Sequence, residues 1–373
     1  MFSFLDREMY IYNSGIEIIA FYMLVFQAGS VLVLHKSKLE FYEHTPNFSI
    51  ERLRILQVIG IGLSSLGIYI TMHQIADFGG INLSVQNLSD LTVINSKARY
   101  SGIRIASGLG FYLGIFDFAT VIVGGILLAA RSGKVIALTP IFLGLYKTYI
   151  TGARASILIS LIFFFTSFVF YKAYLNKGRL PLFTYKSIRY AVLSVILFVL
   201  LFLVVQMTRG GVTDFNRIPA ILKHLNNWFF AYLPGFSIWL DSYRFNEVHF
   251  GSFTFAGIFD QLNIAHREQG LYREFVFIGR SYRTNVFTIY RGLILDFHVF
   301  SFLLMYLMGS VATISFHKFY QLGAWTNFFI IITIYSFFLW QHTVSIFNYN
   351  TILAGVLLAF FMVQLSSFKY VYK

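Results

Sequence analysis

Arginine side chains gather in one segment of this chain, residues 209–291. Eight of its nine basic residues are arginine: Arg209, Arg217, Lys223, Arg244, Arg267, Arg273, Arg280, Arg283 and Arg291. The guanidinium group is a planar fork of donors that matches phosphate and carboxylate oxygens. We therefore expect the segment to bind an anionic ligand.

Two short motifs place further arginines where helices are expected to end. In Thr151-Gly152-Ala153-Arg154, the arginine lies between two apolar stretches with almost no loop. It is either a snorkelling anchor or a ligand for phosphate, because an arginine within a bilayer is costly unless it is paired or faces water. In Thr208-Arg209-Gly210-Gly211, the glycines allow the backbone to approach a ligand closely, or they simply end a helix.

A carboxylate follows the last arginine of the segment. Arg280 and Arg291 are eleven residues apart, about three helical turns, and would share one face if the segment is helical. Asp296 lies five residues after Arg291 and enters an apolar stretch. It is expected to be either the ion-pair partner of Arg291 or a catalytic base at low dielectric.

Histidines offer the other candidate bases, because imidazole titrates near neutral pH. His249 and His266 lie inside the arginine-rich segment, and His298 follows it. A structural role remains the alternative for each of them. Five acidic side chains of the segment are further candidate bases: Asp241, Glu247, Asp260, Glu268 and Glu274.

The elements that must position these residues are membrane-spanning helices. The chain of 373 residues is 57% hydrophobic and 12% charged, whereas soluble proteins are about 25% charged. Its apolar stretches reach the roughly 20 residues that cross a bilayer. The sequence predicts an all-α polytopic membrane protein with about nine to eleven spans. The nine clearest stretches are 14–34, 55–76, 108–130, 135–151, 154–175, 190–208, 293–316, 324–346 and 350–368.

Basic loops predict the orientation of these spans. Lysine and arginine recur at 35–54, 131–134 and 176–189 and in the C-terminal tail. These loops alternate correctly if all of them are cytoplasmic. The N-terminus and residues 209–291 are then outside, and the aromatic stretch 227–232 suits an interfacial or re-entrant element. We predict one integral membrane domain, residues 1–373, with 209–291 as a long outer loop.

Several classes of function are disfavoured by the sequence. The net charge of +13 does not predict nucleic-acid binding, because the basic residues flank apolar spans. Cysteine is absent, which excludes disulfides and cysteine zinc sites. The chain has neither a Gly-x-x-x-x-Gly-Lys phosphate loop nor a His-Glu-x-x-His zinc motif. We expect no metal and no cofactor.

The chain resembles the bacterial oligosaccharide repeat-unit polymerases, the Wzy-type O-antigen and capsule polymerases. The resemblance rests on the topology, on Thr151-Gly152-Ala153-Arg154 and Thr208-Arg209-Gly210-Gly211, and on the stretch from Thr284 through Arg291 to Asp296-Phe297. His298 departs from it, because glycine would be expected after the Asp-Phe pair.

The resemblance implies a location and a reaction. The protein would lie in the bacterial inner membrane with its active site facing the periplasm. A glycan carried on undecaprenyl pyrophosphate would be transferred to a second lipid-linked repeat unit, without nucleotide or metal. Its partners would be this lipid-linked oligosaccharide, membrane lipid and a chain-length regulator.

The resemblance also implies roles for the candidate residues. Arginines would stabilise the diphosphate leaving group, a base would accept the proton of the acceptor hydroxyl, and aromatic rings would stack on sugars. The pyrophosphate ligands would be Arg154, Arg209, Arg280, Arg283 and Arg291. The base would be His249, His266 or Asp296, and the glycan contacts Trp228, Tyr232 and Trp239.

Three other functions stay open. A ligase of the same membrane type would differ only in its acceptor. A flippase or transporter for lipid-linked glycan would show internal repeats with paired broken helices, and none is detectable. A membrane acyltransferase would need a histidine and an arginine near the first spans, where the sequence offers only His35 and His73.

Overall fold

The computed structural model describes most of the chain as α-helix. The described residues are 11–36, 48–84, 87–101, 103, 105, 108–176, 189, 200, 203–207, 219, 221–222, 229–244, 247–265, 272–279, 282–341 and 344–367.

Six stretches of the described chain are long and apolar enough to cross a membrane. They lie in α1 (Asn13–Lys36), α2 (Ile50–Gly79), the consecutive helices α4 (Gly108–Leu113) and α5 (Ile115–Ala129), α7 (Arg154–Leu175), α13 (Phe300–Leu322) and α15 (Asn350–Ser367). The prediction of a helical, membrane-embedded protein agrees with these helices. The predicted count of nine to eleven spans remains a prediction.

Three predicted spans are not among the six. The stretch 135–151 forms α6 (Lys134–Thr151), and the stretch 324–346 contains the shorter helix α14 (Trp325–Leu339). The stretch 190–208 lies mostly outside the described residues. The start of the predicted span 293–316 also differs, because the chain breaks at His298 between α12 (Ile289–Phe297) and α13.

The contacts of the backbone divide the chain into two compact units. Unit 1 consists of Met1–Glu40, Lys223–Gln321 and Thr333–Leu353, and unit 2 of Phe41–Leu222, Leu322–Ile332 and Ala354–Lys373. Three separate stretches make up each unit, so neither could be excised as one continuous segment. The single-domain organisation of residues 1–373 remains a prediction.

Unit 2 packs around α5, whose residues from Phe118 to Leu127 are all buried. Glycines on α5 allow neighbouring helices to approach closely. A Cβ atom at Gly124 would lie 2.4 Å from the Ala137 carbonyl oxygen of α6, and one at Gly125 would lie 2.0 Å from Ser167 Oγ of α7. The backbones of α6 and α7 therefore lie directly against α5.

An ion pair inside unit 2 joins two of the charged residues that the sequence places within spans. Lys147 of α6 pairs with Asp117 of α5, which also accepts a hydrogen bond of 2.5 Å from Ser64 Oγ of α2. A charged group within the apolar layer is stabilised by a partner of opposite charge.

Helix α3 (Leu88–Tyr100) covers the end of α6 in unit 2. Thr92 Oγ1 donates to the Tyr149 carbonyl oxygen at 2.5 Å, and Asn95 Nδ2 donates to the Thr151 carbonyl oxygen at 2.7 Å. These side chains bond carbonyl groups that the end of a helix leaves without partners. The chain then turns at Gly152 (φ 64°), and α7 begins at Arg154.

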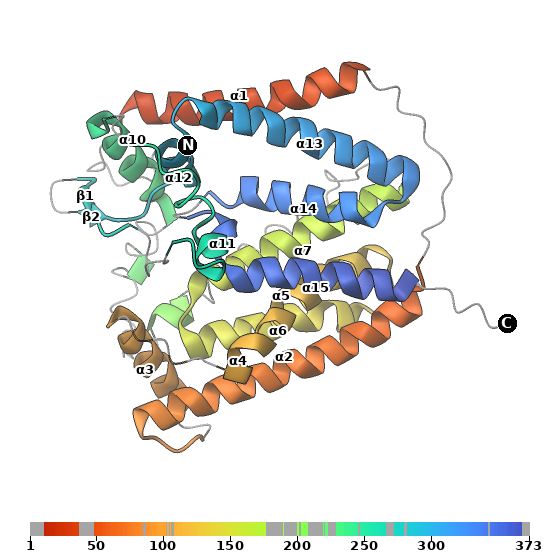
Figure 1. The fold of residues 1–373 in the computed structure, drawn as a ribbon. Coiled ribbons are helices and arrows are strands. Elements are labelled where there is room, and N and C mark those ends of the chain that lie inside the picture. Colours follow the sequence, from red (N-terminus) through yellow and green to blue (C-terminus); the bar gives the residue numbers. More distant parts are fainter. Residues whose placement is uncertain are drawn as a thin grey trace. The chain divides into compact units, whose positions relative to one another are not determined.

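In unit 1, α1 and α13 run side by side (Figure 1). Their close approach depends on Gly29 and Gly309, because a Cβ atom at Gly309 would lie 2.0 Å from the Phe26 carbonyl oxygen. Ser310 Oγ donates to the Gly29 carbonyl oxygen, and Ser30 Oγ donates to that of Gly309, both at 3.2 Å. Such small and hydroxyl-bearing residues are typical of packed helices in membranes.

Candidate functional site

Two arginines of the predicted segment, Arg244 and Arg291, lie with acids and aromatic rings in unit 1. The site is built by α10 (Tyr232–Ser242), the loop 247–255, α12, and the short antiparallel pair β1 (Val276–Phe277) and β2 (Arg283–Thr284). None of these elements belongs to the six candidate spans.

Helix α10 packs against residues 284–286 at a glycine, Gly235. A Cβ atom at Gly235 would lie 2.6 Å from the Val286 carbonyl oxygen and 3.0 Å from Thr284 Cγ2. The absence of a side chain therefore allows the 284–286 backbone to pass directly over α10. One turn later on α10, Trp239 is 5% exposed. Its ring is tilted by 31° against the ring of Tyr243, with 4.6 Å between the centroids.

The guanidinium of Arg291 lies in a box of three aromatic rings. Its Cζ atom is 4.0 Å from the ring centroid of Phe287, 4.1 Å from that of Tyr272 and 4.9 Å from that of Trp239. The side chain is 4% exposed. A cation over aromatic faces is stabilised by the ring quadrupoles, by about 2 kcal/mol or more where water is excluded.

The ion-pair partner of Arg291 is Glu274, not Asp296. Arg291 Nη2 donates to Glu274 Oε2 at 2.6 Å. Burial lowers the pKa of the guanidinium, and its interactions with Tyr272 and with the Glu274 carboxylate oppose this shift. Arg291 Nε and Nη1 are buried without a hydrogen-bond partner among the described residues.

Asp296 anchors the loop that follows α10. Its Oδ1 accepts from the Phe253 N–H group at 3.0 Å and its Oδ2 from the Thr254 N–H group at 2.6 Å. Burial raises the pKa of the carboxyl, and these backbone donors lower it to a smaller extent. Both oxygens thus hold backbone in place, so this geometry favours anchoring over proton transfer for Asp296.

The same loop satisfies the end of α12. The N–H groups of His249 and Phe250 donate to the carbonyl oxygens of Leu295 and Asp296, both at 3.2 Å. The last carbonyls of a helix lack partners within the helix. The loop that carries His249 is therefore fixed to the helix that carries Arg291.

His298 closes α12 in a backbone conformation that favours glycine. Its φ is 44° and its ψ is −125°, a region that side chains rarely adopt. The imidazole Nε2 lies 3.0 Å from the Glu247 carbonyl oxygen and 3.1 Å from the Tyr243 hydroxyl. Because a carbonyl can only accept, Nε2 carries the proton in this contact.

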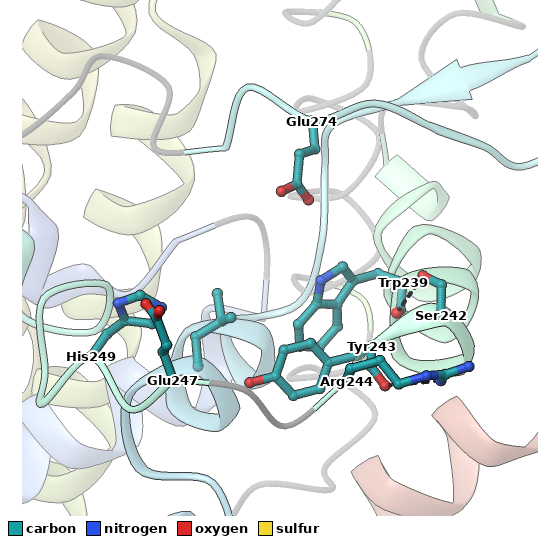
Figure 2. Close-up of a pocket in the computed structure, with 8 residues that line it drawn as sticks. Trp239, Ser242, Tyr243, Arg244, Glu247, His249 and Glu274 are labelled. Atoms are coloured by element: carbon teal, nitrogen blue, oxygen red, sulfur yellow. Dashed lines mark hydrogen bonds between the residues drawn. The ribbon is translucent and has the colours of Figure 1, made fainter.

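These elements surround an open pocket of about 460 Å³ (Figure 2). In Figure 2 the Tyr243 hydroxyl points to the side of Glu247 and His249, and the Arg244 side chain extends the opposite way. Glu274, which precedes β1, extends toward Trp239. The lining residues are Trp239, Ser242, Tyr243, Arg244, Glu247, His249, Glu274 and Leu295. The pocket therefore combines aromatic surface, carboxylates, an imidazole and an exposed guanidinium.

The predicted site residues are only partly brought together. Trp239, His249 and Arg291 meet at the pocket or its wall. Tyr232 starts α10 two turns before Trp239, and Arg283 is exposed on β2, 5.2 Å from the Phe275 ring centroid. Arg154 belongs to unit 2. The predicted residues Arg209, Trp228, His266 and Arg280 lie outside the described residues.

The sequence reasoning missed three aromatic residues. Tyr272 and Phe287 wall the Arg291 guanidinium, and Tyr243 lines the pocket beside Trp239. Tyr272 and Phe287 come from loops with no periodic pattern, so the only available signal was their proximity to arginines in the sequence. No cluster of three or more metal-ligating side chains occurs in the described part of the chain.

Neither a protein-family model, nor a curated protein, nor a solved structure matches this chain.

Proposed function

We propose that this protein is a membrane glycosyltransferase that joins lipid-linked oligosaccharide repeat units. The observation that carries the proposal is the pocket of unit 1, in a chain that has six candidate membrane spans, because this pocket unites aromatic rings with acids, an imidazole and an arginine. The donor would be a glycan on undecaprenyl pyrophosphate and the acceptor a second lipid-linked repeat unit, at the periplasmic face of the inner membrane.

The pocket suits a carbohydrate. Its volume of about 460 Å³ is within the range of pockets that hold small ligands. The Tyr243 ring offers an apolar face with a polar hydroxyl, and Glu247 and Glu274 can accept hydrogen bonds from sugar hydroxyls. Trp239, a predicted glycan contact, packs against the Tyr243 ring, with 4.6 Å between the ring centroids.

The reaction needs a base and a stabilised leaving group. The acceptor hydroxyl oxygen forms a bond to the anomeric carbon, and the bond from that carbon to the diphosphate oxygen breaks with its electron pair. The proton of the hydroxyl passes to His249, which lines the pocket, or to the neighbouring Glu247. Arg244 and Arg291 balance the charge that develops on the diphosphate.

A gel of surface polysaccharide tests this function. A host strain that lacks the gene is complemented with the wild-type protein, Arg244→Gln or Arg291→Lys, and protein amounts are compared by immunoblot. We expect the amount of long-chain polysaccharide to fall at least ten-fold with either variant, while the single-repeat band remains. Arg244 is exposed, so its replacement should leave the amount of protein unchanged. The matched control is Arg189→Gln, an exposed arginine of unit 2.

The pattern of bands separates the competing functions. Loss of every band, the single repeat included, would assign the protein to ligation or to transport of the lipid-linked glycan. An unchanged ladder with both arginine variants at normal protein levels would remove these residues from the reaction. Loss of the ladder with the control variant would mean that the assay does not report on this pocket.

A further inference from the structure

The ion pair between Arg291 and Glu274 joins a buried base to an exposed acid. The Arg291 side chain is 4% exposed, whereas the Glu274 side chain is 69% exposed. Surface ion pairs contribute little to stability, but removing the partner of a buried charge is strongly destabilising. Arg291 therefore requires an anion at this position, while Glu274 has no comparable need for a cation.

The Arg291 guanidinium has hydrogen-bond donors that Glu274 does not use. Only Nη2 donates to the Glu274 carboxylate, and Nε and Nη1 have no partner in the described part of the chain. Buried polar groups without partners are uncommon in folded proteins. The faces of the guanidinium are covered by Phe287, Tyr272 and Trp239, so an added oxyanion must approach along its edge.

Glu274 can leave this position without disturbing the packing. It lies before β1 in a stretch without regular secondary structure, and within the described residues its carboxylate bonds to Arg291 alone. It also lines the open pocket, into which Figure 2 shows its side chain descending. Rotation of this one side chain would open the edge of Arg291 to a ligand in the pocket.

We propose that Glu274 is an internal counter-ion that occupies the diphosphate site of Arg291 until the ligand displaces it. This inference rests on the proposed function for the identity of the ligand. A diphosphate carries more negative charge than one carboxylate and more acceptor oxygens, so it can bond Nη2 and an additional N–H group together. The internal acid keeps Arg291 paired while the pocket is empty. The apparent affinity is then the intrinsic affinity multiplied by the fraction of time that Glu274 is away from Arg291.

The test is the binding of inorganic pyrophosphate to the purified full-length protein in detergent, measured by isothermal titration calorimetry. In Glu274→Gln the amide oxygen can still accept from Nη2, but the competing charge is gone. We expect the dissociation constant of this variant to be about ten-fold lower than that of the wild type. Glu17→Gln is the matched control, because Glu17 is an exposed acid of α1 outside the pocket, and it should bind as the wild type does.

A double variant locates the site. Adding Arg291→Lys to Glu274→Gln should abolish the gain in affinity, because lysine lacks the planar fork of donors. Thermal unfolding of each variant without ligand shows that it is folded. Equal or weaker binding by folded Glu274→Gln would overturn the proposal, as would a double variant that keeps the gain.

Two further comparisons separate the sources of the ligand and the two proposals. Titration with farnesyl pyrophosphate shows whether a prenyl chain adds to the affinity of the diphosphate group. Tighter binding of either compound by Glu274→Gln than by the wild type supports the counter-ion role. This readout does not depend on polymerisation. A gain in pyrophosphate affinity together with an unchanged ladder for the arginine variants would overturn the proposed function and retain the counter-ion.

Discussion

At the scale of single residues, Asp296 shows how burial assigns a role to a carboxylate. Its side chain is completely buried, and both of its oxygens accept backbone N–H groups of the loop 253–254. A base must reach the proton that it abstracts. In this geometry His249 at the pocket is better placed than Asp296 for that task, although both remain predictions.

The raised pKa of Asp296 predicts how stability depends on pH. Because the folded-state pKa lies above the ordinary value of about 3.9, the protonated form stabilises the folded state. That contribution is fully present below the ordinary value and is lost as the pH rises through the raised pKa. The stability of the wild type relative to Asp296→Asn should therefore fall over the pH range above about 4.

Thermal unfolding of both proteins across this range measures the difference, since asparagine does not titrate and all other groups are shared. Loss of one backbone hydrogen bond in the variant shifts its stability equally at every pH. A difference that stays constant, or that grows as the pH rises, would contradict a raised pKa.

At the scale of elements, the corner between α12 and α13 decides where Arg291 and His249 lie. His298 occupies this corner at φ 44°, and its imidazole contacts the Glu247 carbonyl oxygen and the Tyr243 hydroxyl. The sequence reasoning expected glycine here by resemblance. Glycine adopts this backbone conformation without strain, whereas histidine does not. The two contacts of the imidazole at the pocket offset the backbone strain.

Replacement of His298 by two small residues separates the strain from the contacts. Both His298→Ala and His298→Gly lose the imidazole, but only alanine keeps the Cβ atom. We expect the glycine variant to be more stable than the alanine variant by about 1–2 kcal/mol, because only alanine retains strain at this position. Chemical unfolding in detergent measures both free energies of unfolding.

The control is the same pair of substitutions at Ser65, an exposed residue inside α2. In an ordinary helix glycine is less stable than alanine by about 0.5–1 kcal/mol, so the order should reverse. An alanine variant of His298 that equals or exceeds the glycine variant would show that the corner is not strained.

At the scale of the whole molecule, the distribution of basic residues predicts which loops face the cytoplasm. The turn Arg131–Lys134 connects α5 to α6 and belongs to the basic set, whereas Asp241 at the end of α10 belongs to the predicted outer segment. The chain contains no cysteine, so single introduced cysteines report on their own positions.

We expect Asp241→Cys to react with a membrane-impermeant maleimide added to spheroplasts, and Ser132→Cys to react only after the membrane is permeabilised. The reason is that lysine and arginine are retained on the cytoplasmic side of the membrane. Labelling of the unaltered, cysteine-free chain provides the background. The reversed pattern would place the pocket in the cytoplasm and would exclude the periplasmic reaction.

Hydropathy and charge alone predict the class of this protein, a helical membrane protein. Long apolar stretches with few charges must form helices in a bilayer, because every backbone polar group there has to bond within its own segment. This local rule predicted α1, α7 and α15 closely. It failed at the stretch 293–316, since hydropathy does not register a corner that two contacts of one histidine stabilise.

Composition and spacing also predicted Arg291, His249 and Trp239 as functional candidates. They did not predict which residue each of these side chains contacts. Only the tertiary structure decided that Arg291 bonds Glu274, 17 residues earlier, and not the nearer Asp296. The choice depends on the turn of α12, which points Asp296 to the loop 253–254 and Arg291 to the rings of Trp239, Tyr272 and Phe287. Those rings come from three separate segments, and a sequence lists segments without stating which of them meet.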